Sequence, residues 1–403
     1  MVSRRLMEAF RGEGIDARML VVEKLTDSPY VEVAASGFDI KKNFLIERLK
    51  IFMRNGFNRK TLFKIDTATD GLPLWRHPLV ENADVVLLNW INQGMLSLKG
   101  VEKILRMGKK VMWTMHDMWC MTGICHHAGE CRRFMGECGD CPLLGNLARP
   151  KDLSHKTWLR KAALGDLNNK ITYVAVSNWL AEKAHQSSLL RDERVVVIPN
   201  VFNLGNESGK IDRNDDKIRL LFGAARLDDP IKGLPVLVEM TRIIKSEHPR
   251  LAENMELVTF GGVKNPGSLR GMAIPHRHLG MVSGEENVRG VYEGADILVS
   301  ASSYETLPGT LVEAQAYGCI PVSFNQGGQA DITDHLHTGY IAEYSEDVST
   351  SARNLARGVV WAVSVLLDRQ GHDAMLNDMK CAVKQKFSPE AVVRAYLNAM
   401  QNC

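Results

Sequence analysis

The fold of this chain is decided by residues 303–322, which read Ser303-Tyr-Glu-Thr-Leu-Pro-Gly-Thr-Leu-Val-Glu-Ala-Gln-Ala-Tyr-Gly-Cys-Ile-Pro-Val322. The apolar run that precedes them, at 296–301, predicts a strand buried on both faces. Pro308 can occupy the first turn of a helix, and Gly318 can end that helix. The stretch therefore predicts a strand, a turn, a helix and the start of a further strand.

The predicted helix combines an open N-terminus with two glutamates. Its first N–H groups, near Gly309, Thr310 and Leu311, would face an anion such as a diphosphate, and the helix dipole favours that charge. Glu305 would lie at the helix mouth, with Glu313 about one to two turns inside. A carboxylate there can accept hydrogen bonds from ribose hydroxyls. The alternative is an ordinary helix with two surface glutamates.

A second segment, Phe222-Gly-Ala-Ala-Arg-Leu-Asp-Asp-Pro-Ile-Lys-Gly233, follows another predicted strand and precedes a helix that starts near Leu234. It places Arg226 and Lys232 at the carboxyl end of that strand. Arginine can bind phosphate through two parallel hydrogen bonds, and lysine acts as a point charge. The pair can neutralise charge that develops on a departing nucleoside diphosphate. The alternative is a solvated loop.

Short apolar runs alternate with amphipathic stretches along most of the chain, which predicts α/β architecture with two doubly wound, Rossmann-like domains. The predicted strands are 85–88, 111–114, 171–176, 195–198, 218–222, 257–260, 297–300 and 320–323. The polar run at 203–217 predicts a linker. We expect an N-terminal domain over 1–202, a C-terminal domain over 218–385, and a last helix over 386–403 that returns to the N-terminal domain. Two such domains would face each other across a cleft.

Composition limits the class of protein. The chain has 403 residues, 45% hydrophobic and 24% charged, as in a soluble globular protein of two domains. Its net charge of +3 is too small to indicate nucleic acid as a partner. It contains neither a long apolar run typical of a membrane span nor an apolar signal-peptide core at Met1. The cytoplasm is therefore the expected compartment.

The two glutamates and the basic pair together resemble glycosyltransferase family 4, whose members have the GT-B fold. The resemblance implies that Glu305 contacts the donor sugar, that Glu313 contacts the ribose, and that Arg226 and Lys232 hold the diphosphate. The Gly327-Gly328 loop, followed by Asp331, resembles the family's next donor loop. The family usually has Gly-Phe-Gly after the first glutamate, whereas this chain has Thr-Leu-Pro-Gly, so sugar specificity cannot be transferred.

The first domain offers one candidate catalytic residue. His116 follows the strand predicted at 111–114, and the family resemblance places a histidine there beside the donor sugar. Asp117 can either orient His116 or cap a turn. A core histidine is the alternative for this position. Residues 90–144 resemble the subgroup of family 4 enzymes found in exopolysaccharide and colanic-acid-type gene clusters.

That subgroup has a Cys-rich insert, here at 120–141. Cys125, Cys131, Cys138 and Cys141 could form a structural, tetrahedral zinc site with no open position for catalysis. Only the last pair has a typical Cys-x2-Cys spacing, and His126 or His127 could replace one ligand. Free thiols and one or two disulfides are the alternatives.

Residues 41–64 form the most basic stretch, with eight Lys or Arg against one Glu. Its apolar residues recur at helical spacing: Phe44, Leu45, Leu49, Phe52 and Met53. A cationic face beside an apolar face can lie on an anionic membrane surface. The alternative is a helix packed on its own domain with a solvated charged face.

The resemblance implies a retaining glycosyltransferase that moves a sugar from a nucleotide-diphosphate donor to a polysaccharide or lipid-linked glycan. No catalytic metal is expected, because Arg226, Lys232 and helix N-termini can replace it. The protein would be cytoplasmic, with possible peripheral attachment to the cell membrane. A nucleotide-sugar epimerase of the same fold and a catalytically silent scaffold protein are the two competing hypotheses.

The N-terminal domain is expected to lack its first strand. Met1 lies directly inside what reads as the first helix, where Leu6, Met7 and Phe10 are apolar, and the next strand-like run is 18–22. A doubly wound domain begins with a strand before that helix. We therefore expect about 15–25 residues upstream of Met1, enough for one strand and a turn. The alternative is that another strand fills the gap.

Overall fold

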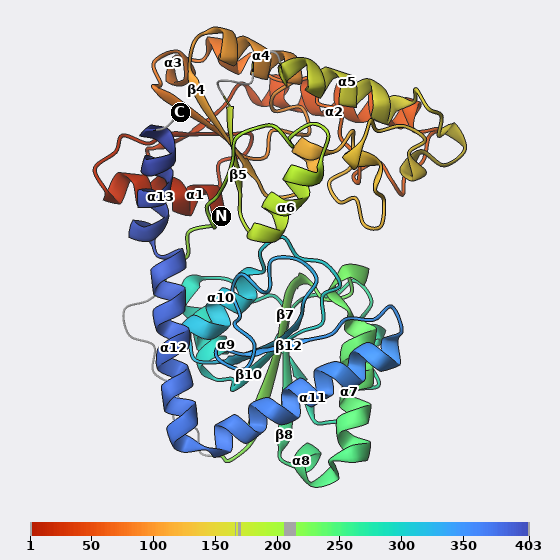
Figure 1. The fold of residues 1–403 in the computed structure, drawn as a ribbon, viewed down its shortest axis with the longest axis vertical. Coiled ribbons are helices and arrows are strands. Elements are labelled where there is room, and N and C mark those ends of the chain that lie inside the picture. Colours follow the sequence, from red (N-terminus) through yellow and green to blue (C-terminus); the bar gives the residue numbers. More distant parts are fainter. Residues whose placement is uncertain (1, 166, 168–170, 205–214, 402–403) are drawn as a thin grey trace. The chain divides into compact units, whose positions relative to one another are not determined.

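The computed structural model describes residues 2–165, 167, 171–204 and 215–401. The chain divides into two compact units: unit 1 comprises Met1–Val201 and Val392–Cys403, and unit 2 comprises Phe202–Ala391 (Figure 1). The predicted linker at 203–217 falls largely outside the described residues. No helix within the described ranges has both the length and the apolar content that a membrane span requires.

Unit 2 is built on a six-stranded sheet in which every paired strand is parallel. Its spatial order is β12-β11-β10-β7-β8-β9. The strands are β7 (Ile218–Arg226), β8 (Met255–Gly262), β9 (His276–His278), β10 (Ile297–Ser300), β11 (Ile320–Phe324) and β12 (Tyr340–Ala342). The sequence predicted the four central strands, whereas β9 and β12 have only three residues each and gave no clear signal.

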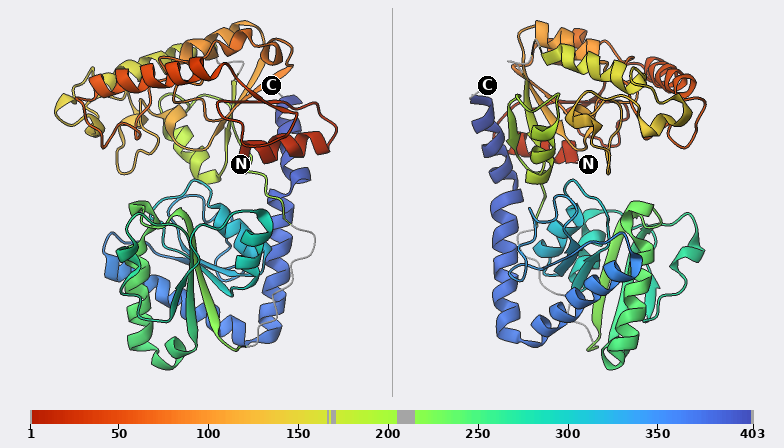
Figure 2. Two further views of the ribbon diagram at one scale, coloured as in Figure 1. Left: turned by 180° about the vertical axis from the view of Figure 1, so that it is seen from behind. Right: turned by 45° about the vertical axis from the view of Figure 1, so that its right-hand side comes forward.

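Helices cover both faces of this sheet, with α7 and α11 on one side and α9 and α10 on the other (Figures 1 and 2). The helices are α7 (Leu234–Glu247), α8 (Pro249–Glu253), α9 (Glu285–Glu293), α10 (Gly309–Ala316), α11 (Val348–Leu367) and α12 (Arg369–Phe387). β10 and β11 are buried along their whole length, as expected of parallel strands covered on both faces. Apolar residues of α7 and α11 join these strands in one continuous core.

Unit 1 has a four-stranded parallel sheet in the order β3-β4-β5-β6 and a separate parallel pair, β1-β2. The strands are β1 (Met19–Val21), β2 (Val31–Val33), β3 (Val85–Leu88), β4 (Lys110–Met115), β5 (Ile171–Ala175) and β6 (Val195–Val197). The helices are α1 (Val2–Gly12), α2 (Gly37–Arg54), α3 (Pro78–Glu81), α4 (Leu98–Arg106), α5 (Leu153–Gly165), α6 (Asn178–Gln186) and the C-terminal α13 (Pro389–Gln401).

The C-terminal helix α13 supplies part of the core of unit 1. Tyr396 packs edge-on against Phe10 of α1, with ring centroids 5.6 Å apart, and its hydroxyl lies 3.0 Å from Thr114 Oγ1 in β4. These side chains share a core with Met112 and Val174 of the central strands. Residues from both ends of the chain therefore cover one face of this sheet.

The pairing of β1 and β2 bears on the strand expected upstream of Met1. Among the described residues, no ladder joins this pair to β3 or to the rest of the four-stranded sheet. The run predicted at 18–22 does form a strand, β1. The upstream strand itself stays a prediction.

A buried cluster of charges connects α2 to the segment that follows it in the chain. Arg48 of α2 is 5% exposed and its Nη2 lies 2.6 Å from Asp66 Oδ1. Glu47 is wholly buried beside them, and its burial, together with the charge of Asp66, raises its pKa to about 8. Arg48 is one of the eight basic residues of the stretch at 41–64, and it does not belong to an exposed cationic face because it pairs with Asp66 inside the unit.

Glu47→Gln should stabilise the protein increasingly as pH rises. Below the unfolded-state pKa, near 4.5, Glu47 is neutral in both states and the substitution has little effect. Between there and about 8, only the unfolded chain ionises, so wild-type stability falls, whereas glutamine carries no such penalty. At high pH, Glu47→Gln should therefore melt at a higher temperature than the wild type, and this difference should be smaller at low pH. Each kcal/mol of free energy that the buried Glu47 costs the wild type should add about 2–4 °C to the difference. Melting curves at pH 5 and pH 8.5 test this, and a constant difference would contradict it.

Candidate functional site

The strand order of unit 2 brings two loops to one point. From β7 the chain goes to β8 and β9 on one side, and then crosses to β10 on the other side of β7. Ile297 of β10 is in register with Leu220 of β7. The carboxyl ends of these adjacent strands form a topological switch point, where ligands of open α/β sheets bind. The loops after β7 and β10 carry the residues that the sequence singled out.

Lys232 and Glu305 meet at this switch point. Lys232 ends a short 3-10 helix, Pro230–Lys232, and its Nζ lies 2.5 Å from Glu305 Oε1. The two side chains are 28% and 19% exposed, so the pair is accessible from solvent. Both line a pocket of about 150 Å³, together with small residues of β7 and the start of α10. The remaining lining residues include Gly223, Ala224, Ala225, Ser300, Ser302, Pro308, Gly309 and Thr310.

The Gly327-Gly328 loop holds the backbone of Glu305. Gly328 donates its N–H to Glu305 O at 2.9 Å, and Glu305 donates to Gln326 O at 3.1 Å. Gly327 has φ +135, and a Cβ there would lie 1.8 Å from Glu305 O. Only glycine allows this close approach. The loop that the sequence associated with donor contacts therefore also supports Glu305.

The N-terminus of α10 lies in the same pocket. Gly309 and Thr310 line it, and Gly318 follows the helix with φ +77. Leu311 differs from the prediction. Its N–H already donates to Pro308 O at 3.1 Å, and its side chain is fully buried. The amide of Leu311 is thus engaged, whereas Gly309 and Thr310 lie at the wall of the pocket.

Arg226 ends β7 beside the pocket, although it does not line it. Its Nη2 donates to Asp229 at 3.0 Å, and its Nε lies 3.5 Å from Asp228. The side chain is 41% exposed. The guanidinium is therefore held by two aspartates at the end of the strand, within the same loop as Lys232.

Glu313 lies about one helical turn after Gly309 and Thr310 on α10, and it does not line the pocket. Its Oε2 accepts a hydrogen bond of 2.9 Å from the hydroxyl of Tyr292 on α9. Tyr292 is completely buried. Sequence reasoning missed this tyrosine, because the partners are 21 positions apart on different helices and nothing in their spacing links them.

In unit 1, His116 follows β4 directly, as predicted. Its Nε2 lies 3.1 Å from Asn89 Oδ1, and burial lowers the pKa of the imidazole. Asp117 accepts from the N–H of Trp119 at 2.7 Å and from His126 Nδ1 at 2.7 Å. Asp117 therefore caps a turn and pairs with His126. Asn89 at the end of β3 was missed by the sequence analysis.

His126 is occupied by acidic partners. Beyond its bond to Asp117, its Nε2 lies 3.5 Å from Asp66. Burial disfavours the imidazolium, but the bonds to Asp117 and Asp66 outweigh it and raise the pKa of His126 to about 9. A protonated imidazole has no lone pair for a metal ion.

The four cysteines proposed as zinc ligands lie within one region of unit 1. Burial raises the pKa of the Cys125, Cys138 and Cys141 thiols to about 11 each, and neighbouring cysteine sulfurs contribute to each rise. The N–H of Gly123 donates to Cys138 Sγ at 3.2 Å. Within the part of the chain that the structure describes, no three His, Cys, Asp or Glu side chains are close enough to hold a metal ion. Zinc binding stays a prediction and would require the sulfurs to draw together.

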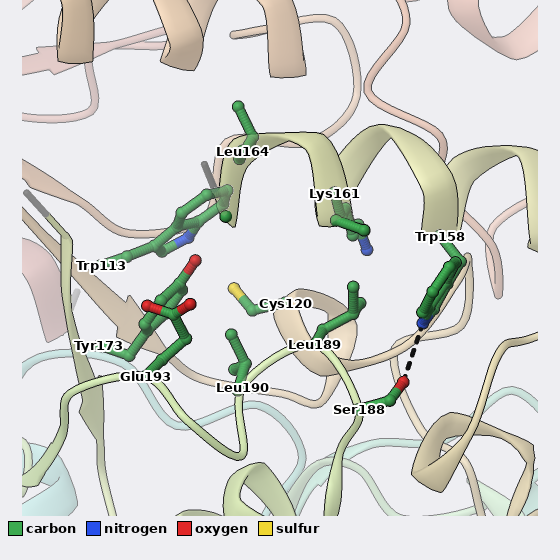
Figure 3. Close-up of a pocket in the computed structure, with 12 residues that line it drawn as sticks. Trp113, Cys120, Trp158, Lys161, Leu164, Tyr173, Ser188, Leu189, Leu190 and Glu193 are labelled. Carbon is green, nitrogen blue, oxygen red and sulfur yellow. Dashed lines mark hydrogen bonds between the residues drawn. The ribbon is translucent and has the colours of Figure 1, made fainter. Parts of the chain in front are cut away.

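A second hollow, of about 190 Å³, lies in unit 1 between α5 and the sheet (Figure 3). Trp113 and Tyr173 stack on one side of it, with ring centroids 6.1 Å apart, and Trp158 lies on the other. Lys161 of α5 is buried beside it, which lowers the pKa of its amine to about 8. Its Nζ donates to the carbonyl oxygens of Trp119 and Thr122. This lysine therefore ties α5 to the start of the Cys-rich insert.

Comparison with known proteins finds a family match within unit 2. Residues 218–360 match the protein family described as glycosyl transferases group 1. The putative colanic acid biosynthesis glycosyl transferase WcaC of Escherichia coli is 25% identical over 287 residues, or 69% of this chain and 66% of that protein. A glycogen synthase of Pseudomonas putida is 26% identical over 209 residues, which are 48% of this chain and 38% of the synthase. The chain thus matches well under half the length of that synthase.

Solved structures establish the fold. A glycosyltransferase from Rickettsia africae aligns with 99% of this chain and 93% of its own at a TM-score of 0.62 and 15% identity. The fold is GT-B. This confirms the fold class predicted from the sequence. Anabaena HepE, solved in complex with UDP, aligns with 82% of each chain at a TM-score of 0.52 and 14% identity.

Gly233, in the loop that carries Lys232, lies too close to the backbone of Ala301 to accept a side chain. It has φ +70 directly after Lys232, and a Cβ there would lie 2.0 Å from Ala301 O. Gly233→Ala should therefore destabilise unit 2 by at least about 1–3 kcal/mol. Gly290→Ala is the matched control, because Gly290 lies inside α9 with no atom near its missing side chain. Urea unfolding of both variants tests this, and equal stability of Gly233→Ala and the wild type would contradict it.

Proposed function

We propose that this protein is a retaining glycosyltransferase that transfers a sugar from a nucleotide-diphosphate donor. The observation that carries the proposal is the pocket at the switch point of unit 2, where Lys232, Glu305 and the N-terminus of α10 converge. A cation, a carboxylate and open helix amides are the groups that a sugar diphosphate requires. The match of residues 218–360 to glycosyl transferases group 1 and the UDP complex of HepE support the same class of donor.

The chemistry follows from the charges in this pocket. The donor's diphosphate would bind the amides of Gly309 and Thr310 and the ammonium of Lys232. Arg226, with its exposed guanidinium, would add a second cation as negative charge develops on the leaving group. Glu305 would then lie nearest to the sugar, where it stabilises positive charge at the anomeric carbon. Glu313 would accept the ribose hydroxyls.

In this proposal the two cations and the helix N-terminus replace a catalytic metal. No Asp-x-Asp motif occurs near the site, since the aspartates at 215–216 and 228–229 are adjacent pairs. His116, with a pKa lowered by burial, would be neutral at physiological pH and could hydrogen-bond a sugar hydroxyl. We assign His116 a catalytic role in addition to that of Glu305.

The acceptor proposed is a polysaccharide or a lipid-linked glycan, with the protein in the cytoplasm and peripheral on the cell membrane. The similarity to WcaC supports the polysaccharide class. The exposed face of α2 supports attachment to a membrane. This face carries a stripe of large apolar side chains at helical spacing, seven, four and four residues apart. They are Phe38 (75% exposed), Leu45 (63%), Leu49 (57%) and Met53 (50%).

Exposed basic side chains occur on α2 and in the segment directly after it. The exposed lysines and arginines of the segment are Lys41, Lys42, Arg54, Arg59, Lys60 and Lys64. Each can contribute about 1 kcal/mol of attraction to an anionic surface. The stripe and these charges together suit the interface of an anionic bilayer, with the apolar side chains inserted between lipid headgroups.

We also propose a structural zinc ion on Cys125, Cys131, Cys138 and Cys141. Four thiolates are a donor set that zinc prefers, and the N–H that Gly123 donates to Cys138 partly offsets the rise in the pKa of this thiol that burial causes. Zinc would order the insert and take no part in catalysis.

Donor transfer is tested with a panel of UDP, ADP and GDP sugars. Wild-type protein should release nucleoside diphosphate and transfer or hydrolyse one of these sugars. Glu305→Ala and Lys232→Ala should each lower turnover at least tenfold, or about 1.4 kcal/mol in barrier. Glu313→Ala should chiefly weaken donor binding.

Lys245→Ala, which changes an exposed lysine on α7, is the control for Lys232→Ala and should keep full activity. Wild-type turnover in all three site variants would contradict the assignment. Recovery of an epimerised donor would favour an epimerase. The absence of any reaction across the panel would favour a binding protein.

Membrane attachment is tested by sedimentation with vesicles of phosphatidylcholine and phosphatidylglycerol. Leu45→Gln with Leu49→Gln, and separately Lys41→Glu with Lys42→Glu, should reduce the bound fraction several-fold. Raised salt should also reduce it, through screening. Lys99→Glu, an exposed charge reversal on α4, is the control and should bind as the wild type does. Equal sedimentation of every variant refutes the membrane role of α2.

Zinc is tested by elemental analysis of protein purified without added metal. About one equivalent per chain is expected, and Cys138→Ser should lose it. Cys381→Ser, at an exposed cysteine outside the insert, should keep it, as should changes at Cys120 and Cys319. Metal-free protein whose cysteines all titrate as thiols would rule the site out.

A further inference from the structure

Tyr292 is a buried polar residue that touches the proposed ribose carboxylate. It belongs to α9, is completely buried, and donates its phenolic O–H to Glu313 Oε2 at 2.9 Å. A buried hydroxyl in an apolar core is costly unless it has such a partner. Phenylalanine would fill the same space, so packing alone does not require tyrosine here. What the hydroxyl adds is its hydrogen bond to Glu313.

The core fixes where this hydroxyl points. The ring of Tyr292 packs edge-on against Phe260 of β8, with centroids 6.0 Å apart, and stacks on Tyr317 at 5.9 Å. The thiol of Cys319 donates to the backbone carbonyl of Tyr292 at 2.9 Å. These contacts come from β8 and from the segment after α10. The phenol is therefore held from several sides before it meets Glu313.

The phenol also keeps its proton. Burial and the negative charge of Glu313 raise the pKa of Tyr292 well above its usual value. It is consequently a hydrogen-bond donor at neutral pH. A glutamate side chain on a helix surface has several rotamers of similar energy, and a fixed donor on one oxygen selects among them.

We infer that Tyr292 is a positioning residue that fixes Glu313 for the ribose, and that it thereby makes the site discriminate between ribonucleotides and 2′-deoxyribonucleotides. This inference rests on the proposed function, which assigns Glu313 to the ribose. A site arranged to accept hydrogen bonds from a diol rejects the analogue that lacks one hydroxyl, because part of the arranged carboxylate is then left unpaired. Without the Tyr292 hydroxyl, Glu313 loses one fixed donor on Oε2, so the ligand must contribute more to ordering this carboxylate, which weakens ribose binding.

The test compares the affinities of UDP and 2′-deoxy-UDP, and of ADP and 2′-deoxy-ADP, by titration calorimetry. Wild-type protein should prefer the ribonucleotide about tenfold. Tyr292→Phe should weaken ribonucleotide binding about threefold to tenfold, leave the deoxy form nearly unchanged, and so reduce the preference. With a sugar donor, its KM should rise while kcat at saturation stays close to wild type. Glu313→Gln should also reduce the preference.

Tyr396→Phe is the matched control, since it removes a buried phenol of unit 1 that bonds Thr114. It should leave all four affinities unchanged. Melting curves verify that Tyr292→Phe is folded. An unchanged ribose preference in Tyr292→Phe, with a reduced one in Glu313→Gln, would overturn the inference alone. An unchanged preference in Glu313→Gln would overturn both the inference and the ribose role of Glu313. A wild-type protein that binds none of the four nucleotides would overturn the proposed function as well.

Discussion

The parallel pairing of β10 with β7 is the constraint on which the candidate site depends. These strands are distant in sequence, yet Ile297 and Leu298 of β10 lie in register with Leu220 and Leu221 of β7. Both strands then end at the same edge of the sheet, so the loop carrying Lys232 and the loop carrying Glu305 must meet. Backbone contacts reinforce this, because Ser303 donates its N–H to Ile231 O at 2.9 Å. An ion pair between residues 73 positions apart is thus a consequence of sheet topology.

In unit 1, charged residues connect helix α2 to the loop that carries His116. One face of α2 contributes Glu47, Arg48 and Ile51 to the interior, and the opposite face exposes apolar and basic side chains. The buried face connects through Asp66 and His126 to Asp117, directly beside His116. The helix proposed to touch the membrane and the loop that carries the proposed catalytic histidine are therefore linked by one continuous set of charged contacts.

Much of this arrangement could be predicted from the sequence, and the reason is periodicity. Continuous apolar runs marked the long parallel strands, and Pro308 and Gly318 marked the ends of α10. Residues that follow such strands could be assigned to one sheet edge without knowing the strand order. Tyr292, Asn89 and the partners of Arg48 could not be predicted, because each depends on which distant side chain lies opposite. A basic residue in an amphipathic stretch looks solvated until its buried partner, here Asp66, is seen.

The central claim is that the pocket formed by Lys232, Glu305 and the N-terminus of α10 binds the diphosphate of a nucleotide sugar. A crystal structure of the protein with UDP or ADP bound tests this claim most directly. The account predicts phosphate oxygens within hydrogen-bond distance of the amides of Gly309 and Thr310 and of Lys232 Nζ, with Glu305 released from its lysine. A nucleotide seated elsewhere in the protein, with the Lys232–Glu305 pair intact and the pocket empty, would contradict it.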